Sequence, residues 1–445
     1  MPCLLVDSFD FKQYPDANHA LKHALEIRDS GDWALLEHFC ANALQCFPGD
    51  VELSWQLSHS HWMRHDCMKA EAVMRDAAML HPDNGLVTGA IAMYLNEEAR
   101  YEEAEALYRQ AIVQSPNAPH LPIDLADLEL RRGAWRDGWT RFEHRLTNPH
   151  HGDKSVVTRV EREAPRWRGE SLAGRRVVVY SEIGHGDDIQ FVRLYPRFAE
   201  LVRAHGGEPM LAVRHVLHSL IERVVPDCVL VAEHAFSGCD YSIPMMSMPF
   251  WLGLMPADIE GRAYLHADAE RVAAWRCLLE EEGADNLRVG IVWAGSPTHR
   301  RDGQRSIPVD ALAPLWRLSN VTFYPVAPGR DDDIAKMRAA GACVVEVAQR
   351  YRDNFHDSAA LLTALDVLVT VDSSPLHLGG ALGRPVLAMI DLASHWCWGT
   401  GETQPWYDSV QLLRQHAAGD WRPVVERVAD ELAQRVRMHQ RTAGK

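Results

Sequence analysis

The feature that most constrains the fold is a 34-residue spacing in the first third of the chain. Prolines stand at positions 48, 82 and 116, a spacing of 34 residues both times, and alanines recur in phase at 43, 77 and 111. A fixed period of this length indicates an array of helix pairs, in which small residues allow close helix packing and proline ends each second helix. We therefore expect residues 15–147 to form an α-solenoid.

One stretch of this array is specific enough to name its repeat type. Residues 99–111 (Ala99-Arg-Tyr-Glu-Glu-Ala-Glu-Ala-Leu-Tyr-Arg-Gln-Ala) resemble the second helix of a tetratricopeptide repeat. Such arrays expose a concave face that usually takes a peptide or a partner protein. With three or four units, peptide binding and simple packing against another domain or another copy both stay open.

Charge and cysteine usage exclude several classes of partner and compartment. The chain has 46 Lys and Arg against 61 Asp and Glu, a net charge of −15, which disfavours nucleic acid or an anionic membrane as partner. No apolar run reaches the length of a membrane span. Nine cysteines without a Cys-x-x-Cys pair indicate reduced thiols. No signal peptide is evident, so we expect a cytoplasmic protein, whose oligomeric state the sequence does not reveal.

The rest of the chain alternates between short strands and helices. Apolar, β-branched runs predict buried parallel strands, and residues 148–170, which lack an apolar period, predict a linker. We expect three parts, a helical repeat domain (1–150), a first α/β half (151–285) and a second α/β half (286–445). The strands are expected at residues 176–181, 209–213, 229–232, 287–296 (including the small-residue turn that ends it), 321–326, 343–347, 367–371 and 386–390.

The first candidate site follows the strand at 176–181. Gly184 and Gly186 allow a tight turn and close approach of a ligand to the backbone. Asp187 and Asp188 stand where the next helix begins, so one can cap it while the other projects beside His185. A carboxylate there could act as a general base, although two aspartates that merely serve the helix start fit the residues somewhat better.

The second candidate site follows the strand at 367–371. Asp372, Ser373 and Ser374 are candidates for the N-cap of a short helix, and Pro375 suits its first turn. A helix that starts at the carboxyl end of a parallel strand directs free N–H groups at the crevice where ligands bind. A phosphate or pyrophosphate cradle and a capped turn without a ligand are about equally compatible with this stretch.

A third, basic segment follows the strand and turn at 287–296. Arg300, Arg301 and Arg305 concentrate positive charge there, and arginine forks suit phosphate oxygens. We expect Arg305 to contact phosphate and the other two to be solvated. The acidic run 331–333 fits the start of a helix better than a metal site, and no metal is predicted.

Three motifs, taken together, resemble a known family. They are Gly184-His-Gly-Asp-Asp-Ile-Gln-Phe, Val289-Gly-Ile-Val-Trp-Ala-Gly-Ser with Asp302-x-x-Arg-Ser-Ile-Pro, and Val371-Asp-Ser-Ser-Pro-Leu-His-Leu-Gly-Gly-Ala-Leu-Gly-Arg-Pro-Val. Residues 176–415 resemble the heptosyltransferase-like glycosyltransferases of family 9. Residues 15–440 resemble bacterial proteins that join tetratricopeptide repeats to such a domain. The resemblance implies a GT-B fold, two Rossmann-like halves across a cleft, and a nucleotide diphospho-sugar donor with no metal or other cofactor.

The resemblance also implies roles for individual residues. Asp187 matches the proposed base, and the acceptor is expected to be a protein or a glycan held through the repeats. Cys397 departs from the pattern, because family members usually carry a basic residue there, which bears on donor choice. The alternative is a non-catalytic repeat adaptor with a degenerate transferase domain. The predicted substrate-binding residues are Gly186, Trp293, Ser296, Arg305, Asp372, Ser373, Ser374 and His377.

Overall fold

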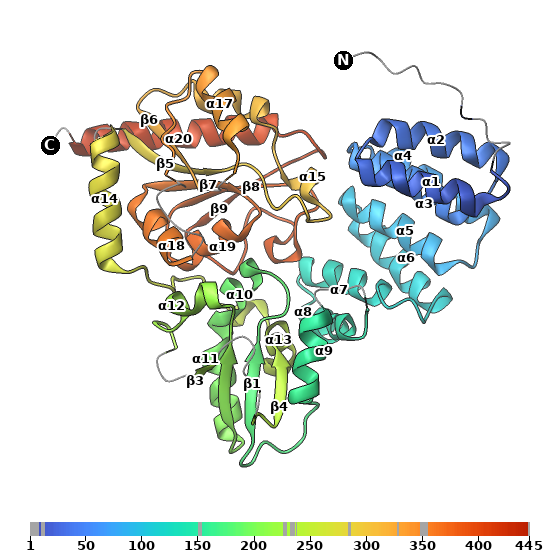
Figure 1. Ribbon diagram of the computed structural model, residues 1–445, viewed down its shortest axis with the longest axis horizontal. Helices are drawn as coiled ribbons and strands as arrows, with labels where there is room; N and C mark the ends of the chain where they lie inside the picture. Colours follow the sequence, from blue (N-terminus) through green and yellow to red (C-terminus); the bar gives the residue numbers. More distant parts are fainter. Residues whose placement is uncertain are drawn as a thin grey trace. The chain divides into compact units, whose positions relative to one another are not determined.

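The computed structural model describes residues 14–149, 154–225, 229–231, 238–283, 286–326, 329–347 and 355–443, together with Phe9 and Phe236. The chain divides into two compact units, residues 1–128 with 416–419, and residues 129–415 with 420–445 (Figure 1). The domain boundaries predicted near 150 and 285 fall at residues outside the described ranges, and they stay predictions.

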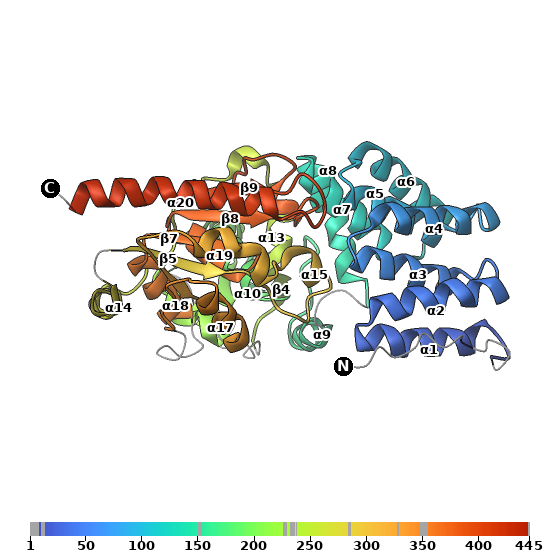
Figure 2. The ribbon, with the colours of Figure 1, turned by 90° about the horizontal axis from the view of Figure 1, so that it is seen from above.

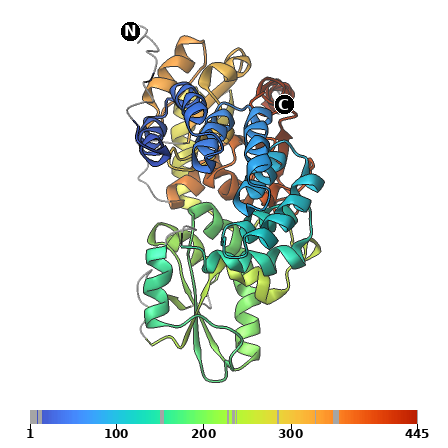
Figure 3. The same ribbon diagram turned by 90° about the vertical axis from the view of Figure 1, so that its right-hand side faces the viewer.

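The first unit is a stack of antiparallel helix pairs (Figure 3). Its second helices begin at residues 33, 67 and 101, and α8 of the second unit begins at 135, so the 34-residue period continues without interruption. Ala43, Ala77 and Ala111 are buried, as the close packing of paired helices requires. The predicted α-solenoid is confirmed. The helices are α1 (Ala17–Ser30), α2 (Trp33–Cys46), α3 (Val51–Met63), α4 (Cys67–Leu80), α5 (Gly85–Glu97), α6 (Tyr101–Gln114) and α7 (Leu121–Arg131), whose last three residues belong to the second unit.

The last repeat helix, α8 (Trp135–Phe142), belongs to the second unit. Its two tryptophans are buried against aromatic rings of the loop at residues 394–407, which follows strand β8 (Val386–Ile390). The Trp135 ring stacks on Trp406 with centroids 5.5 Å apart, and the Trp139 ring meets Trp396 edge-on at 5.1 Å. Large aromatic side chains in such contacts dominate core energetics, so α8 is part of the core of this unit.

A four-stranded parallel sheet opens the second unit, in the order β3-β2-β1-β4. Figure 3 shows this sheet between α9 (Lys154–Glu163) and α11 (Tyr195–Ala204). Helix α9 corrects the predicted linker, because Val157, Val160 and Ala164 recur at helical spacing and are buried against β1 and β2. Sequence analysis did not find β4. The other bounds are β1 (Arg176–Tyr180), β2 (Glu208–Ala212), β3 (Val229–Val231), β4 (Tyr241–Pro244), α10 (His185–Phe191), α12 (His218–Ile221) and α13 (Met248–Leu252).

Helix α14 (Ala269–Gly283) precedes a five-stranded parallel sheet in the order β6-β5-β7-β8-β9. Helix α20 (Arg422–Ala443) runs along one face of this sheet, and α18 and α19 lie on the other side (Figure 2). The strand predicted at 343–347 is wrong, because this described segment forms an isolated bridge between Val344 and Phe323 instead of a ladder. Strand β9 was not predicted. The bounds are β5 (Leu287–Val292), β6 (Val321–Pro325), β7 (Val367–Val371), β8 (Val386–Ile390), β9 (Val410–Arg414), α15 (Asp302–Arg305), α16 (Ala313–Trp316), α17 (Asp331–Ala339), α18 (Phe355–Ala364) and α19 (Ser374–Ala381).

Strand order places the candidate turns where α/β sheets bind ligands. The order reverses beside β1 in the first sheet and between β5 and β7 in the second. Ligands of open α/β sheets bind outside the carboxyl ends of the strands at such switch points. The turns after β1, β5 and β7 are the three segments that the sequence singled out. Among the described residues, no helix is both long and apolar enough to cross a membrane.

Candidate functional site

The turn after β1 carries the two candidate carboxylates, and the structure gives them different roles. Asp187 lies in the first turn of α10, where its Oδ2 accepts a hydrogen bond of 3.0 Å from the N–H of Gly184. Its side chain stays half-buried. Asp188 points inward, is 1% exposed and forms an ion pair with Arg214. Asp187 therefore both fixes the helix start and remains the carboxylate of the pair that a ligand could reach.

The surroundings of Asp187 make it a stronger base than an ordinary aspartate. Burial raises its pKa above the usual value, and the charge of Glu182 raises it further. His395, the Gly184 N–H and Arg214 act in the opposite direction without cancelling the effect of burial. A carboxylate with a raised pKa accepts a proton more readily, which is the property that a general base needs.

Helix α19 begins shortly after β7, as predicted, and one of the three predicted candidates is its N-cap, but without a side-chain capping bond. Ser373 occupies the N-cap position, and its hydroxyl donates to the carbonyl of Val371 at 3.2 Å instead of accepting from the helix. Pro375 lies in the first turn, where a missing N–H has no consequence for the helix. The hydroxyl of Ser373 thus stabilises the turn between β7 and α19.

A glycine brings the two turns together. A Cβ atom at Gly186 would lie 3.0 Å from Cδ2 of His377 and 3.6 Å from Cα of Ser374. The start of α10 therefore packs directly on the start of α19, and a larger residue than glycine would require the His377 ring to shift by a few tenths of an ångström. This contact places Asp187, which follows Gly186, beside the hydroxyl-bearing helix start.

Two arginines converge on the turn after β5. A Cβ at Gly295 would lie 2.6 Å from Cζ of Arg305, so this guanidinium lies flat against the glycine. Arg305 also donates to the carbonyl of Asp372 at 3.1 Å, and Arg330 donates to the carbonyl of Gly295 at 3.1 Å. The buried Nε of Arg305 lies 3.5 Å from Oδ1 of Asp302, so the guanidinium also forms an ion pair within its own helix. This guanidinium joins the turns after β5 and β7.

The neighbouring arginines behave differently from each other. Arg300 is exposed, as predicted. The prediction that Arg301 is solvated is wrong, because its guanidinium pairs with the buried carboxylate of Asp391 at 2.6 Å. Asp391 directly follows β8, so this pair fixes the basic loop to the carboxyl edge of the second sheet.

The imidazole of His377 is anchored through Nδ1, which lies 3.0 Å from the hydroxyl of Tyr407. The hydroxyl of Tyr264 donates to the carbonyl of Ile189 at 2.6 Å. When the proton of the neutral ring is on Nδ1, His377 donates to Tyr407, and its Nε2, which lies on the side of Gly186, is an acceptor.

Burial keeps this imidazole neutral. It lowers the pKa of His377 to about 4, with the charge of Asp372 opposing and that of His395 assisting the shift. The ring stacks on Trp398 with centroids 5.1 Å apart, which excludes water from one of its faces. In the tautomer that donates from Nδ1 to Tyr407, the neutral ring can accept a hydrogen bond from a hydroxyl placed near Gly186.

Two predicted residues lie apart from this group. Trp293 is 2% exposed, and its indole N–H donates to Asp333 at 3.0 Å, which makes it a buried link between β5 and α17. Ser296 is exposed, and its hydroxyl bonds that of Thr298 at 2.8 Å. In the described part of the chain, no three His, Cys, Asp or Glu side chains are grouped to hold a metal ion.

His395 is the functional candidate that sequence analysis missed. Its charge influences the pKa values of both Asp187 and His377, so it lies near the two turns. Its Nδ1 lies 3.1 Å from the buried Sγ of Cys397. Buried Arg414 holds the surrounding loop by donating to the hydroxyl of Ser394 and the carbonyl of Trp398. The aromatic and polar composition of residues 394–407 was the available signal, but it did not single out this histidine.

Comparison with family models gives a match in the second sheet. Residues 320–432, which include β6 to β9 and the first half of α20, match glycosyltransferase family 9 (heptosyltransferase). The predicted resemblance and the predicted fold class, tetratricopeptide-type repeats followed by a GT-B arrangement of two parallel sheets, are confirmed. The match supports glycosyl transfer as the class of activity, and it specifies neither donor nor acceptor.

Three similar proteins illustrate the likeness. Protein FlbA of Caulobacter vibrioides is 28% identical over 73% of this chain, which spans 57% of the length of FlbA. The family 9 glycosyl transferase of Veillonella parvula is 15% identical, covering 60% of this chain and 99% of its own, with a TM-score of 0.39. The ADP-heptose lipopolysaccharide heptosyltransferase II of E. coli is 12% identical with the same coverage and a TM-score of 0.41.

Proposed function

We propose that this chain transfers a sugar from a nucleotide diphospho-sugar to an acceptor nucleophile, with Asp187 as the base. The observation that carries the proposal is the packing of Gly186 against His377 and Ser374. It sets the carboxylate turn of the first sheet beside the hydroxyl-bearing turn of the second, where the family 9 match lies. A transferase needs these two functions, proton removal and binding of the leaving group, on either side of the reacting carbon.

In the proposed reaction, an acceptor hydroxyl or amide attacks the anomeric carbon of the sugar. The acceptor proton passes to the carboxylate of Asp187 as the new bond forms. The bond between the anomeric carbon and the diphosphate oxygen breaks, and the nucleoside diphosphate leaves with the electron pair. The raised pKa of Asp187 favours the proton transfer, because the base must hold the proton that the acceptor releases.

We assign the stabilisation of the negative charge that develops on the diphosphate to residues of the second sheet. Arg305 offers a guanidinium fixed against Gly295, and α19 offers the positive end of its dipole after Ser373. Preorganised donors of this kind stabilise a developing anion without rearranging. Metal independence is proposed for the same reason, since these groups supply the charge that a divalent ion would otherwise supply.

We assign to neutral His377 a hydrogen bond with a hydroxyl group of the donor. We assign the tautomer that donates from Nδ1 to Tyr407, in which Nε2 is an acceptor and suits a sugar or ribose hydroxyl rather than a phosphate oxygen, which has no proton to donate. His395 is assigned to the same site because of its electrostatic influence on Asp187. We assign binding of the acceptor to the repeats. A protein or a glycan fits the concave face of such arrays.

The test is a thermal-shift screen of the full chain with UDP-, GDP-, CMP-, dTDP- and ADP-linked sugars, followed by an assay of nucleotide release. A ligand that binds only the folded protein raises its apparent stability. We expect one donor class to stabilise the wild type and Asp187→Asn equally, and only the wild type to release nucleotide. A chain that neither binds nor turns over any of these donors would be better described as a repeat adaptor.

A further inference from the structure

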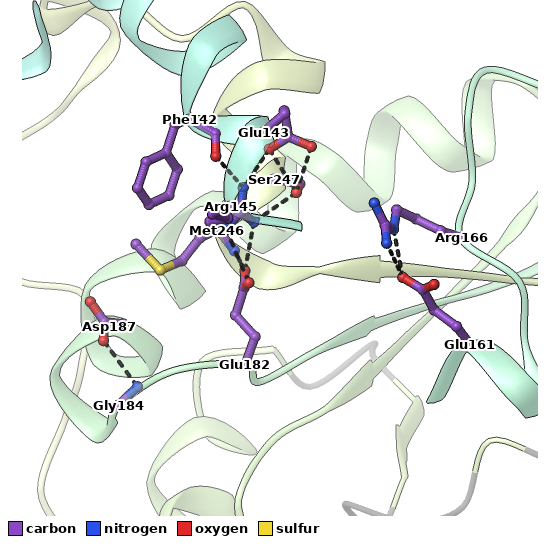
Figure 4. Close-up of polar contacts among 10 residues, drawn as sticks. All are labelled: Phe142, Glu143, Arg145, Glu161, Arg166, Glu182, Gly184, Asp187, Met246 and Ser247. Carbon is purple, nitrogen blue, oxygen red and sulfur yellow. Dashed lines mark hydrogen bonds and ion pairs between the residues drawn. The ribbon is translucent and has the colours of Figure 1, made fainter. Parts of the chain in front are cut away.

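A fully buried arginine stands behind the turn that carries Asp187 (Figure 4). Arg145 lies in the short 3-10 segment Glu143–Leu146, directly after α8, and is 0% exposed. Its guanidinium forms a fork with Glu182, with Nε to Oε2 at 3.1 Å and Nη2 to Oε1 at 2.8 Å. Glu182 is 4% exposed and follows β1 by two residues. The fork therefore joins the end of the repeat helices to the end of the first strand.

Further bonds fix the guanidinium from its other sides. Arg145 donates to Glu143 at 2.6 Å and to the hydroxyl of Ser247 at 2.8 Å. Ser247 donates in turn to Glu143 at 2.9 Å. Charges removed from water persist only when paired and hydrogen-bonded in this way, and a bidentate fork fixes orientation as well as charge. Figure 4 shows the members of the network around the guanidinium.

The network reaches the candidate base through Glu182. The carboxylate of Glu182 also accepts the N–H of Met246 at 2.9 Å, so it is fixed between two segments. Two residues further along the chain, Gly184 donates to Asp187. Glu182 also acts on Asp187 through space, since its charge raises the pKa of that residue. Position and proton affinity of Asp187 thus both depend on where Glu182 is fixed.

We propose that Arg145 is a positioning residue for the transfer reaction, holding the turn of Asp187 in place through Glu182. The role in catalysis rests on the proposed function, but the contact between Arg145 and Glu182 can be tested without any substrate. It implies that the segment after α8 supports the active site without contacting the substrate. The part of the chain that completes the repeat array thereby becomes part of the catalytic unit.

The main test measures hydrogen–deuterium exchange of the peptide covering residues 182–188 in the full chain. Arg145→Met should speed its exchange roughly tenfold or more, because the turn loses its anchor and opens locally. Arg145→Lys keeps the charge without the fork and should restore part of the protection. The matched control is Arg166→Met, which removes a half-buried pair with Glu161 in the same sheet region without touching this turn (Figure 4).

A second variant keeps the test decisive if Arg145→Met fails to fold. Combining it with Glu182→Gln removes both charges, so no buried carboxylate is left without its partner. The amide oxygen that this substitution introduces can still accept from the N–H of Met246, but the fork is lost. We expect this folded double variant to show the same faster exchange at residues 182–188, with unchanged exchange in β7 and α19.

A third measurement addresses the electrostatic part of the role. In protein labelled with 13C-carboxyl aspartate, the Asp187 signal is assigned by its absence from Asp187→Asn. Glu182→Gln should lower its titration midpoint, by roughly one pH unit or less, because a negative charge has been removed. The remaining groups that act on Asp187 (His395, Arg214 and the Gly184 N–H) are unchanged by this substitution.

The outcomes separate the two proposals. Unchanged exchange at residues 182–188 in the Arg145 variants, or an equal change in Arg166→Met, overturns the positioning role even if nucleotide-sugars are turned over. Faster exchange without binding of any nucleotide-sugar supports the anchor and refutes only the proposed function. Where a donor is turned over, the positioning role predicts a lower kcat for Arg145→Lys with little change in KM.

Discussion

Acid should destabilise this protein through His377, and the size of the effect follows from its burial. The pKa of His377 is lowered from 6.5 to about 4 in the folded state, so the unfolded chain binds a proton at pH 5 that the folded chain refuses. The stability that this provides is complete above pH 6.5 and is lost as the pH falls towards 4. At about 1.4 kcal/mol per pH unit, the loss is about 2 kcal/mol at pH 5 and approaches about 3 kcal/mol below pH 4.

The substitution that isolates this contribution is His377→Asn. Its side-chain amide can still donate to Tyr407 from near the position of Nδ1, but it does not titrate. Urea unfolding at pH 7.5 and pH 5, followed by tryptophan fluorescence, reports on the site because Trp398 stacks on this ring. Between pH 7.5 and pH 5, the free energy of unfolding should decrease in the wild type. The decrease should be smaller in the variant, by about 2 kcal/mol.

The comparison between wild type and variant cancels the other histidines, which are present in both. His205 is exposed, and His205→Asn serves as the control that should leave the pH dependence of the wild type unchanged. An identical loss of stability in wild type and His377→Asn would refute the reasoning. It would mean that the imidazole is protonated in the folded state, and His377 could then donate to a phosphate instead of accepting from a hydroxyl.

Three further predictions concern the site and its support. Asp187→Asn should retain donor binding and lose turnover by about 10²–10⁴-fold, and the acidic limb of the wild-type rate profile should lie above pH 3.8 because the base must be ionised. Arg305→Lys should weaken donor affinity about tenfold in a titration calorimetry experiment, whereas Arg300→Lys, at an exposed position, should not. Trp396→Ala should cost about 3–5 kcal/mol in urea unfolding, since this ring is 1% exposed; a loss under about 1 kcal/mol would contradict its place in the core.

Much of the fold could be predicted because its signals are local and periodic. The 34-residue spacing predicted the helix pairs, and continuous apolar runs predicted β1, β5, β7 and β8. Strand β9 was missed because it mixes apolar and polar residues over five positions, and residues 343–347 were predicted as a strand on composition alone. Composition measures the tendency of a segment to be buried, whereas pairing depends on neighbours that the sequence does not name.

The candidate site could be predicted only in part, for a similar reason. Asp187 and Arg305 lie in the segments that follow strands β1 and β5, so the edge of the sheet to which they belong can be inferred from the chain itself. Trp293 also stands at a strand end, but its indole turns inward to Asp333, which a motif cannot indicate. His395 reaches the site from a loop 208 positions after Asp187, and only the folded chain brings the two together.

The tryptophans of α8 have a practical consequence for anyone dividing this protein into fragments. A fragment cut at residue 151 would lack Trp135 and Trp139 and would leave the indoles of Trp396 and Trp406 facing water. It would be prone to aggregate, because a large apolar patch would be uncovered. A chimaera that exchanges the repeat array for another should therefore keep the native chain from residue 129 onward, where the second compact unit begins.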